Sequence, residues 1–365
     1  MNLPVFITAI LWLFPSLALI CYQMYYATIS KNAFGTYAYF IIFFVSAVFC
    51  FCGMNNYKKL GQRALIWVFI GLGFLLFALV ELSNNIFVIS IFISKIGSPF
   101  FLSLLGIIPF VIASILMLRV NKEPVPAYGW LLGLTSFVIL VVLCLMSNLI
   151  IFGSNMFLVL TLGNQIPCFV LIGLLLVVLI KHCSRTIWKP WILLTLGLFC
   201  ASLGHLSMWF HVVAVVLILG SVCIMFMQFK NNAKTLNFVI ASATLIILLA
   251  AFMAMSWYDL FSAQGQNILV IIALISVNIA LASSFAFLVG TASLRHANDM
   301  GNPLVWATSG LIMISAGFFL PYMLESFNLF QNAVMARDVL LSLGAMLVCV
   351  GVVIDNQQQR ELSFE

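Results

Sequence analysis

The ionisable side chains within or beside long apolar segments are the first candidates for function in this sequence. Such a group is costly inside a lipid bilayer, so each is a functional candidate by default. They are Glu81, His205, His211, Asp259, Glu325, Arg337 and Asp338. Glu81 is a candidate solute-binding or proton-carrying carboxyl. The alternative is a residue near the membrane interface that bonds a polar neighbour.

Histidine spacing gives one candidate cofactor ligand. His205 and His211 flank Trp209, which places them on different helices or in a tight turn, so they do not form an i, i+4 metal pair. His205 is a candidate haem ligand, and the alternative is an interfacial histidine bonded to backbone or water. His182 and His296 are expected in solvated loops.

Polar residues beside a proline give a second candidate site. Asn164 and Gln165 precede Pro167 in an apolar segment, and Pro15 is the other proline taken to interrupt a span. Proline-interrupted spans near the membrane midplane are the usual indication of a transporter's binding site. We therefore predict that Asn164, Gln165 and Glu81 are substrate-binding candidates.

The composition excludes most soluble classes. Of 365 residues, 65% are hydrophobic and 7% are charged, whereas a soluble domain carries about 25% charged residues. That excludes a soluble enzyme, a disordered chain and a nucleic-acid-binding module. The nine cysteines show no spacing typical of zinc or of a disulfide framework, and they are expected to pack within the spans.

The apolar segments predict an all-α, polytopic membrane protein of about twelve transmembrane helices in a single domain over residues 1–365. Each segment is near the roughly 20 residues that a membrane span requires. The first lacks the features of a cleavable signal peptide and is expected to remain as a span. The expected spans are 4–27, 36–56, 64–90, 98–119, 128–151, 156–180, 188–206, 208–229, 235–256, 266–291, 303–324 and 335–355.

The loop charges predict the orientation. With these spans, twelve of the 15 lysines and arginines fall on one side of the membrane and three on the other. Cytoplasmic loops carry the excess of positive charge. Both termini are therefore expected in the cytoplasm, with the chain in a bacterial inner membrane and the bilayer as its first partner.

An internal repeat is a further interpretation. The third helix of each group of four carries a glycine after a tryptophan, as in Trp67–Gly73, Trp191–Gly197 and Trp306–Gly310. Three pseudo-repeats of four spans would explain this pattern, and so would chance similarity among apolar segments.

Residues 119–130, RVNKEPVPAYGW, carry basic residues, then Glu-Pro and Trp, between the expected fourth and fifth spans. This loop resembles the corresponding loop in subunit I of the haem-copper oxidases, in the branch that holds C-type oxidases and nitric oxide reductases. Four shorter stretches also resemble that subunit. Gly35–Ile41 resembles the start of its second span, and Leu162–Asn164 resembles part of its sixth span. Gly204–Leu206 resembles the His pair before its eighth span, and Ala336–Arg337 resembles the start of its last span.

The positions that hold metal in that family differ here. The resemblance places Gly35, Asn164 and Gly204 where the family has histidine ligands, and its tenth-span ligands fall near Ile268 and Val270. Haem iron and copper use imidazole or thiolate ligands. Only His205 keeps a ligand type, so the resemblance implies a copy that does not reduce oxygen or nitric oxide by the family mechanism.

Three functions stay open on the sequence. The first is a non-catalytic structural, assembly or regulatory subunit without cofactors, alongside other subunits of a respiratory-type membrane complex. The second is a secondary transporter or permease with a polar site near the sixth span. The third is a membrane haem protein that retains a single haem.

Overall fold

The computed structural model describes residues 34–54, 61–85, 99–120, 124–152, 157–182, 188–203, 302–325 and 333–364, together with single positions between 210 and 224 and at 327. Within these residues every regular element is an α-helix, as expected. They belong to two compact units, one within Tyr39–Cys183 and Asn302–Glu365 and the other within Met1–Ala38 and Ser184–Gly301. The single-domain expectation stays a prediction.

The helices begin and end close to the apolar segments. They are α2 (Phe34–Met54), α3 (Gln62–Asn85), α5 (Pro99–Val120), α6 (Ala127–Phe152), α7 (Phe157–His182), α8 (Trp188–Leu203), α12 (Pro303–Gly317), α13 (Leu320–Glu325) and α14 (Ala333–Phe364). A helix satisfies its own backbone, which is why apolar chains adopt it in lipid. The expected spans 4–27, 235–256 and 266–291 lie outside the described residues.

Some helices are suited to cross a membrane. Among the described residues three stretches are long and apolar enough: Gln62–Leu82, Ala127–Ser147 and Gln165–His182. Shorter apolar helical stretches are Phe40–Met54, Leu105–Val120, Pro303–Gly317 and Leu340–Asn356. The chain is therefore a helical protein with membrane-spanning candidates.

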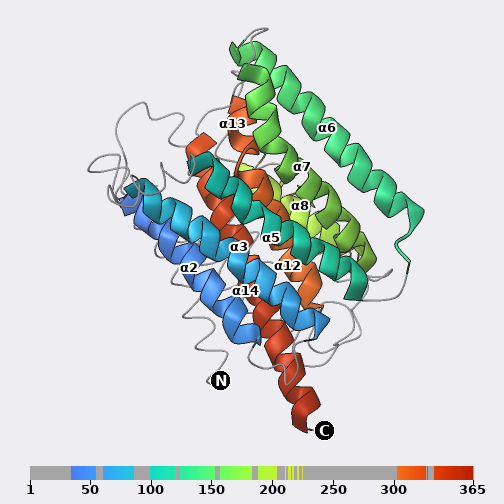
Figure 1. Cartoon of the computed structure of the whole chain (residues 1–365). Helices are drawn as coiled ribbons and strands as arrows, with labels where there is room; N and C mark the ends of the chain where they lie inside the picture. The colour runs from blue at the N-terminus through green and yellow to red at the C-terminus, as the bar shows by residue number, and fades with distance from the viewer. Residues whose placement is uncertain are drawn as a thin grey trace, which may run out of the picture. The chain divides into compact units, whose positions relative to one another are not determined.

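Antiparallel helices of the larger unit lie side by side, as α6 and α7 do in Figure 1, and they approach closely at glycines. A Cβ added to Gly344 of α14 would lie 2.6 Å from the carbonyl oxygen of Gly310 in α12. A Cβ on Gly133 of α6 would lie 2.8 Å from the carbonyl oxygen of Gly173 in α7. Small residues at such crossings bring helix backbones together in lipid, where dispersion replaces the hydrophobic effect.

Aromatic rings fill the space between α2, α3 and α5. Phe77 of α3 stacks on Phe110 of α5 with ring centroids 5.7 Å apart, and Phe43 of α2 lies 5.8 Å from Phe77. Gly106 makes room for the Phe77 ring, since a Cβ there would lie 3.2 Å from it. This packing fixes the register of α3 against α5.

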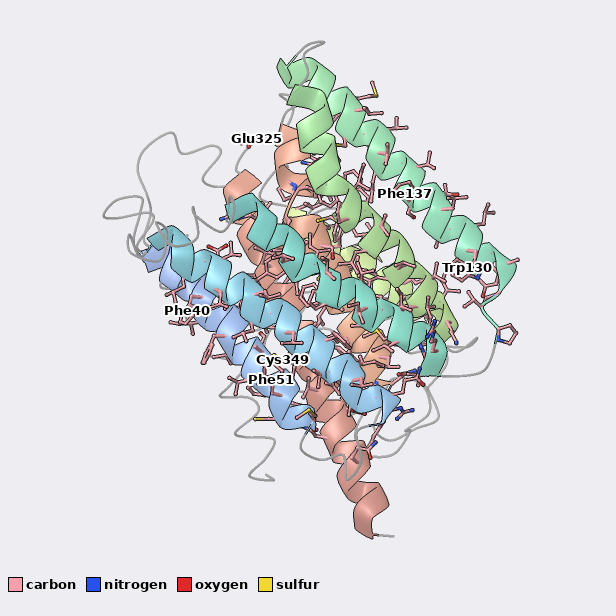
Figure 2. The ribbon with its side chains drawn as sticks, viewed as in Figure 1. Phe40, Phe51, Trp130, Phe137, Glu325 and Cys349 are labelled. Carbon is pink, nitrogen blue, oxygen red and sulfur yellow. The ribbon has the colours of Figure 1, made fainter. Side chains whose placement is uncertain are left out.

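Helix α6 is the most exposed of these elements. Leu131, Leu134 and Ile139 are between 52% and 66% exposed, and all are apolar. Trp130 and Phe137 mark this helix in Figure 2. An exposed apolar face of this kind is typical of a helix that meets lipid.

Candidate functional site

A proline interrupts the helical segment that begins at Pro303. Helix α12 ends at Gly317, residues 318 and 319 form a turn, and α13 begins at Leu320. Pro321 has no N–H to donate to the Gly317 carbonyl oxygen, and its ring crowds that oxygen. The Phe319 N–H instead donates to Ala316 O at 3.2 Å. The expected span 303–324 is therefore two helices.

Two more prolines lie inside neighbouring helices. Pro109 is within α5 and Pro167 is within α7. Each removes the N–H that would bond the carbonyl four residues earlier, at Leu105 and Gly163. The sequence interpretation took Pro167 and Pro15 as the internal prolines. It missed Pro109 and Pro321, and Pro15 lies outside the described residues.

Ring contacts place the three interruptions at one depth of the helix bundle. Phe319, in the α12–α13 turn, meets Phe169 of α7 edge-on with centroids 4.7 Å apart. Phe318, in the same turn, stacks on Phe77 of α3 at 4.6 Å. Phe77 in turn stacks on Phe110, the residue after Pro109. We call Pro109, Pro167 and the turn Gly317–Leu320 the break level.

A polar pair joins α6 and α7 near this level. The Cys144 thiol donates to Gln165 Oε1 at 2.6 Å, and Gln165 lies two residues before Pro167. Cys144 is buried and Gln165 is half-buried. Substrate binding at Gln165 stays a prediction. Its carboxamide lies beside the break level, two residues before Pro167.

The other expected site residues are distributed as follows. Glu81 is half-buried in the last turns of α3, one turn beyond Phe77 and so one turn from the break level. The backbone of Asn164 belongs to α7, and its side chain lies outside the described residues. His205 also lies outside them.

A half-buried cation belongs to the same region. Leu340 and Leu341 of α14 contact Gly317, since a Cβ on that glycine would lie 3.2 Å from each side chain. Arg337 is half-buried and lies one turn before Leu341. Helix α14 begins four residues before Arg337, at Ala333. Among the described side chains, the carboxyl of Glu81 and the guanidinium of Arg337 thus lie within about one turn of the break level.

At the opposite end of these helices, basic side chains cover helix C-termini. His182 Nε2 lies 2.8 Å from Met117 O, and the Lys181 ammonium donates to Leu118 O. The last carbonyls of a helix have no partner within it, and cations there suit the helix dipole. The expectation that His182 is solvated is therefore wrong, because the ring is buried against the end of α5.

A buried carboxyl that the sequence interpretation missed lies at this same end. Trp67 Nε1–H donates to Asp355 Oδ2 at 2.6 Å, and each side chain is 1% exposed. The signal was present in the sequence, since Asp355 closes the last apolar segment.

Candidate metal ligands can be placed only among the residues that the structure describes. No group of three or more His, Cys, Asp and Glu side chains in that part of the chain could hold a metal ion. Of the positions that the oxidase resemblance assigns to metal ligands, Gly35 and Asn164 lie on α2 and α7, and Gly204, His205, Ile268 and Val270 are outside the described residues.

Comparison with known proteins adds no relative. No protein-family model, curated protein or solved structure matches this chain.

Proposed function

We propose that this protein is a membrane carrier for a small zwitterionic organic solute, of the amino-acid type, which binds at the break level. The observation that carries the proposal is the meeting of three proline-interrupted helices around one depth of the bundle. Interrupted helices are where secondary transporters place their substrate, because carbonyls released from the helix can coordinate it.

The side chains near the break level suit a solute with both charges. The carbonyl oxygens of Leu105, Gly163 and Gly317 lose their usual donor to proline. Together with Glu81 they favour an ammonium group, and Arg337 favours a carboxylate. The Phe rings would contact an apolar side chain.

Helix topology completes the proposal. We expect twelve spans with both termini in the cytoplasm of a bacterium and the chain in its inner membrane. In support, Arg119 and Lys181 lie at adjoining helix ends, where Lys181 donates to Leu118 O, and Arg63 lies at the start of α3. The antiparallel pairing of α3 and α5 brings Arg63 to the same end, as a cytoplasmic face requires.

Uptake by the purified protein in liposomes tests this proposal. A mixture of radiolabelled amino acids is the probe, and the wild-type chain should accumulate at least one of them. Gln165→Leu keeps the size of the side chain and removes its hydrogen-bonding groups, so uptake should fall about tenfold if the carboxamide binds solute. Absence of uptake by the wild type would refute the amino-acid carrier.

The matched control is Thr135→Val on α6. The Thr135 hydroxyl is exposed and donates to Leu131 O of its own helix at 2.8 Å. Its loss should leave uptake unchanged, which separates a local effect at Gln165 from a general effect of losing a polar group in the bundle.

The second candidate is a non-catalytic subunit related to subunit I of the haem-copper oxidases. The backbone contact between Gly310 and Gly344 favours it, because helices this close make a rigid scaffold and leave no space between them for a porphyrin. This candidate keeps the expectation that the chain holds no haem, and it expects other subunits of a respiratory-type complex as partners.

Visible spectra separate the remaining alternatives. A purified sample of a haem protein, held through His205, would show a strong porphyrin band that His205→Ala removes. A scaffold would show neither that band nor amino-acid uptake, and it would purify with partner subunits from its native membrane.

A further inference from the structure

The pair Trp67–Asp355 joins two helices that are far apart in the sequence. The indole N–H of α3 donates to the carboxyl of α14 at 2.6 Å, and both side chains are 1% exposed. A charged side chain is almost never fully buried unless it is paired. Within a membrane protein such a group is a functional candidate.

The packing around Asp355 is tight. Gly351, one turn before it, lies against the first turn of α12, since a Cβ there would be 2.7 Å from Pro303 O and 3.2 Å from the Trp67 ring. Gly53 of α2 lies against Val352 in the same way. Asp355 therefore lies beside the N-terminus of α12, whose partial positive charge favours a carboxylate.

Water is within reach from one side. Asp355 is at the end of the apolar stretch Leu340–Asn356, and α14 continues to Phe364 through polar residues. On α3, the exposed Gln62 and Arg63 are about one turn from Trp67. This carboxyl therefore lies near the end of the helix bundle that we expect to face the cytoplasm.

We propose that Asp355 is a proton-binding site that regulates the carrier in response to pH, loaded from the cytoplasmic side. In the step, the carboxylate takes up one proton and becomes a carboxylic acid, and the reverse step returns the proton to water. The role in transport rests on the proposed function, whereas proton binding itself does not.

The geometry selects a proton over a metal cation. An indole N–H points at Oδ2 and would repel a metal ion placed there. A sodium or calcium ion also needs several oxygen ligands around it. A proton needs only the carboxyl itself.

Protonation changes the link between α3 and α14. A hydrogen bond to a carboxylate is roughly twice as strong as one between neutral groups. Loss of the charge therefore weakens the bond from Trp67 and the attraction to the α12 N-terminus, and so it weakens the link between α3 and α14.

Among the described residues, charged positions on the helices at this end are the following. Arg63 lies one turn before Trp67 on α3, and Arg360 and Glu361 follow Asp355 on α14. The described part of α12 has no titratable side chain, and across from it Lys181 and His182 are held against the end of α5. Arg63 is exposed, so water screens its effect on the buried carboxyl.

Infrared difference spectra of the full chain in liposomes test the proposal, taken between about pH 4 and about pH 9. The wild type should show a carboxylic C=O band that appears on acidification. Asp355→Asn should lose that band, and Trp67→Phe should shift it because the indole donor is gone. Glu325→Gln, on α13 at the far end of the bundle in Figure 2, should retain it.

The outcomes are distinct. A spectrum unchanged by both Asp355→Asn and Trp67→Phe would overturn the proposal. If Asp355→Asn does not fold, the shift of the carboxylic C=O band in Trp67→Phe is the deciding result. A band assigned to Asp355 in a protein that takes up no amino acid would support the proton site and refute the carrier. In a working carrier, the pH on the side of Asp355 should change the uptake rate of the wild type and leave that of Asp355→Asn unchanged.

Discussion

The backbone contact between α12 and α14 allows a worked prediction for Gly310→Ala. The new methyl group would overlap the Gly344 carbonyl oxygen and lie 2.8 Å from Val348 Cγ2. Ordinary contact needs about 3.5–4.0 Å, so the helices must separate by about 1 Å, and a gap of that size forfeits up to half of the dispersion energy of the atoms involved. The Gly344 carbonyl oxygen and the Val348 nitrogen, which would lie 2.9 Å from the new methyl carbon, are backbone atoms that cannot rotate away. We therefore expect a cost near the upper end of overpacking, about 3 kcal/mol.

The assay is thermal unfolding in detergent, followed by tryptophan fluorescence. Gly310→Ala and Gly344→Ala should each lower the midpoint by several degrees. The double variant should cost less than the two together, since the first separation makes room for the second methyl group. Gly220→Ala is the control, because among the described residues its Cβ would meet only Leu193 Cδ1, at 3.8 Å. If Gly310→Ala unfolds at the same midpoint temperature as the wild type, the close crossing of α12 and α14 is refuted.

Two further predictions concern packing and capping. Phe77→Ala should cost about 3 kcal/mol, since the ring is 2% exposed and meets Phe43, Phe110 and Phe318; a chemical-denaturation midpoint equal to that of the wild type would contradict this. Asn302→Ala should cost about 1 kcal/mol, because the Asn302 side chain accepts from Leu304 N–H at 3.1 Å and donates to His182 O at 3.1 Å. Asn302→Asp should keep the cap on α12. Equal hydrogen exchange at the start of α12 in the wild type and both variants would contradict this prediction.

The helix positions were predictable from composition and length. Spans expected at 36–56, 98–119 and 128–151 correspond to α2, α5 and α6 within a few residues. The reason is that a membrane span must be long and apolar, and that in lipid a single segment can satisfy its backbone hydrogen bonds only as a helix. Helix α14 continues past residue 355 because its polar residues are good helix formers, to which hydropathy is insensitive.

The candidate site was predictable only in part. Pro167 and Gln165 stood out because they interrupt an apolar segment, but Pro321 was taken as part of a continuous span. The bond between Trp67 and Asp355 joins residues 288 positions apart, and no local pattern encodes such a contact. His182 was misplaced because a residue just after a span looks solvated, whereas here a neighbouring helix end covers it.

The Pro321→Ala variant tests the central claim, that solute binds where the helices are interrupted, most directly. Alanine supplies the N–H that Gly317 O lacks and lets α12 and α13 join into one helix, which should keep or raise thermal stability, since proline costs about 3 kcal/mol within a helix. Amino-acid uptake into liposomes by this folded variant is the measurement. We predict that uptake is lost; uptake at the wild-type rate would contradict the account.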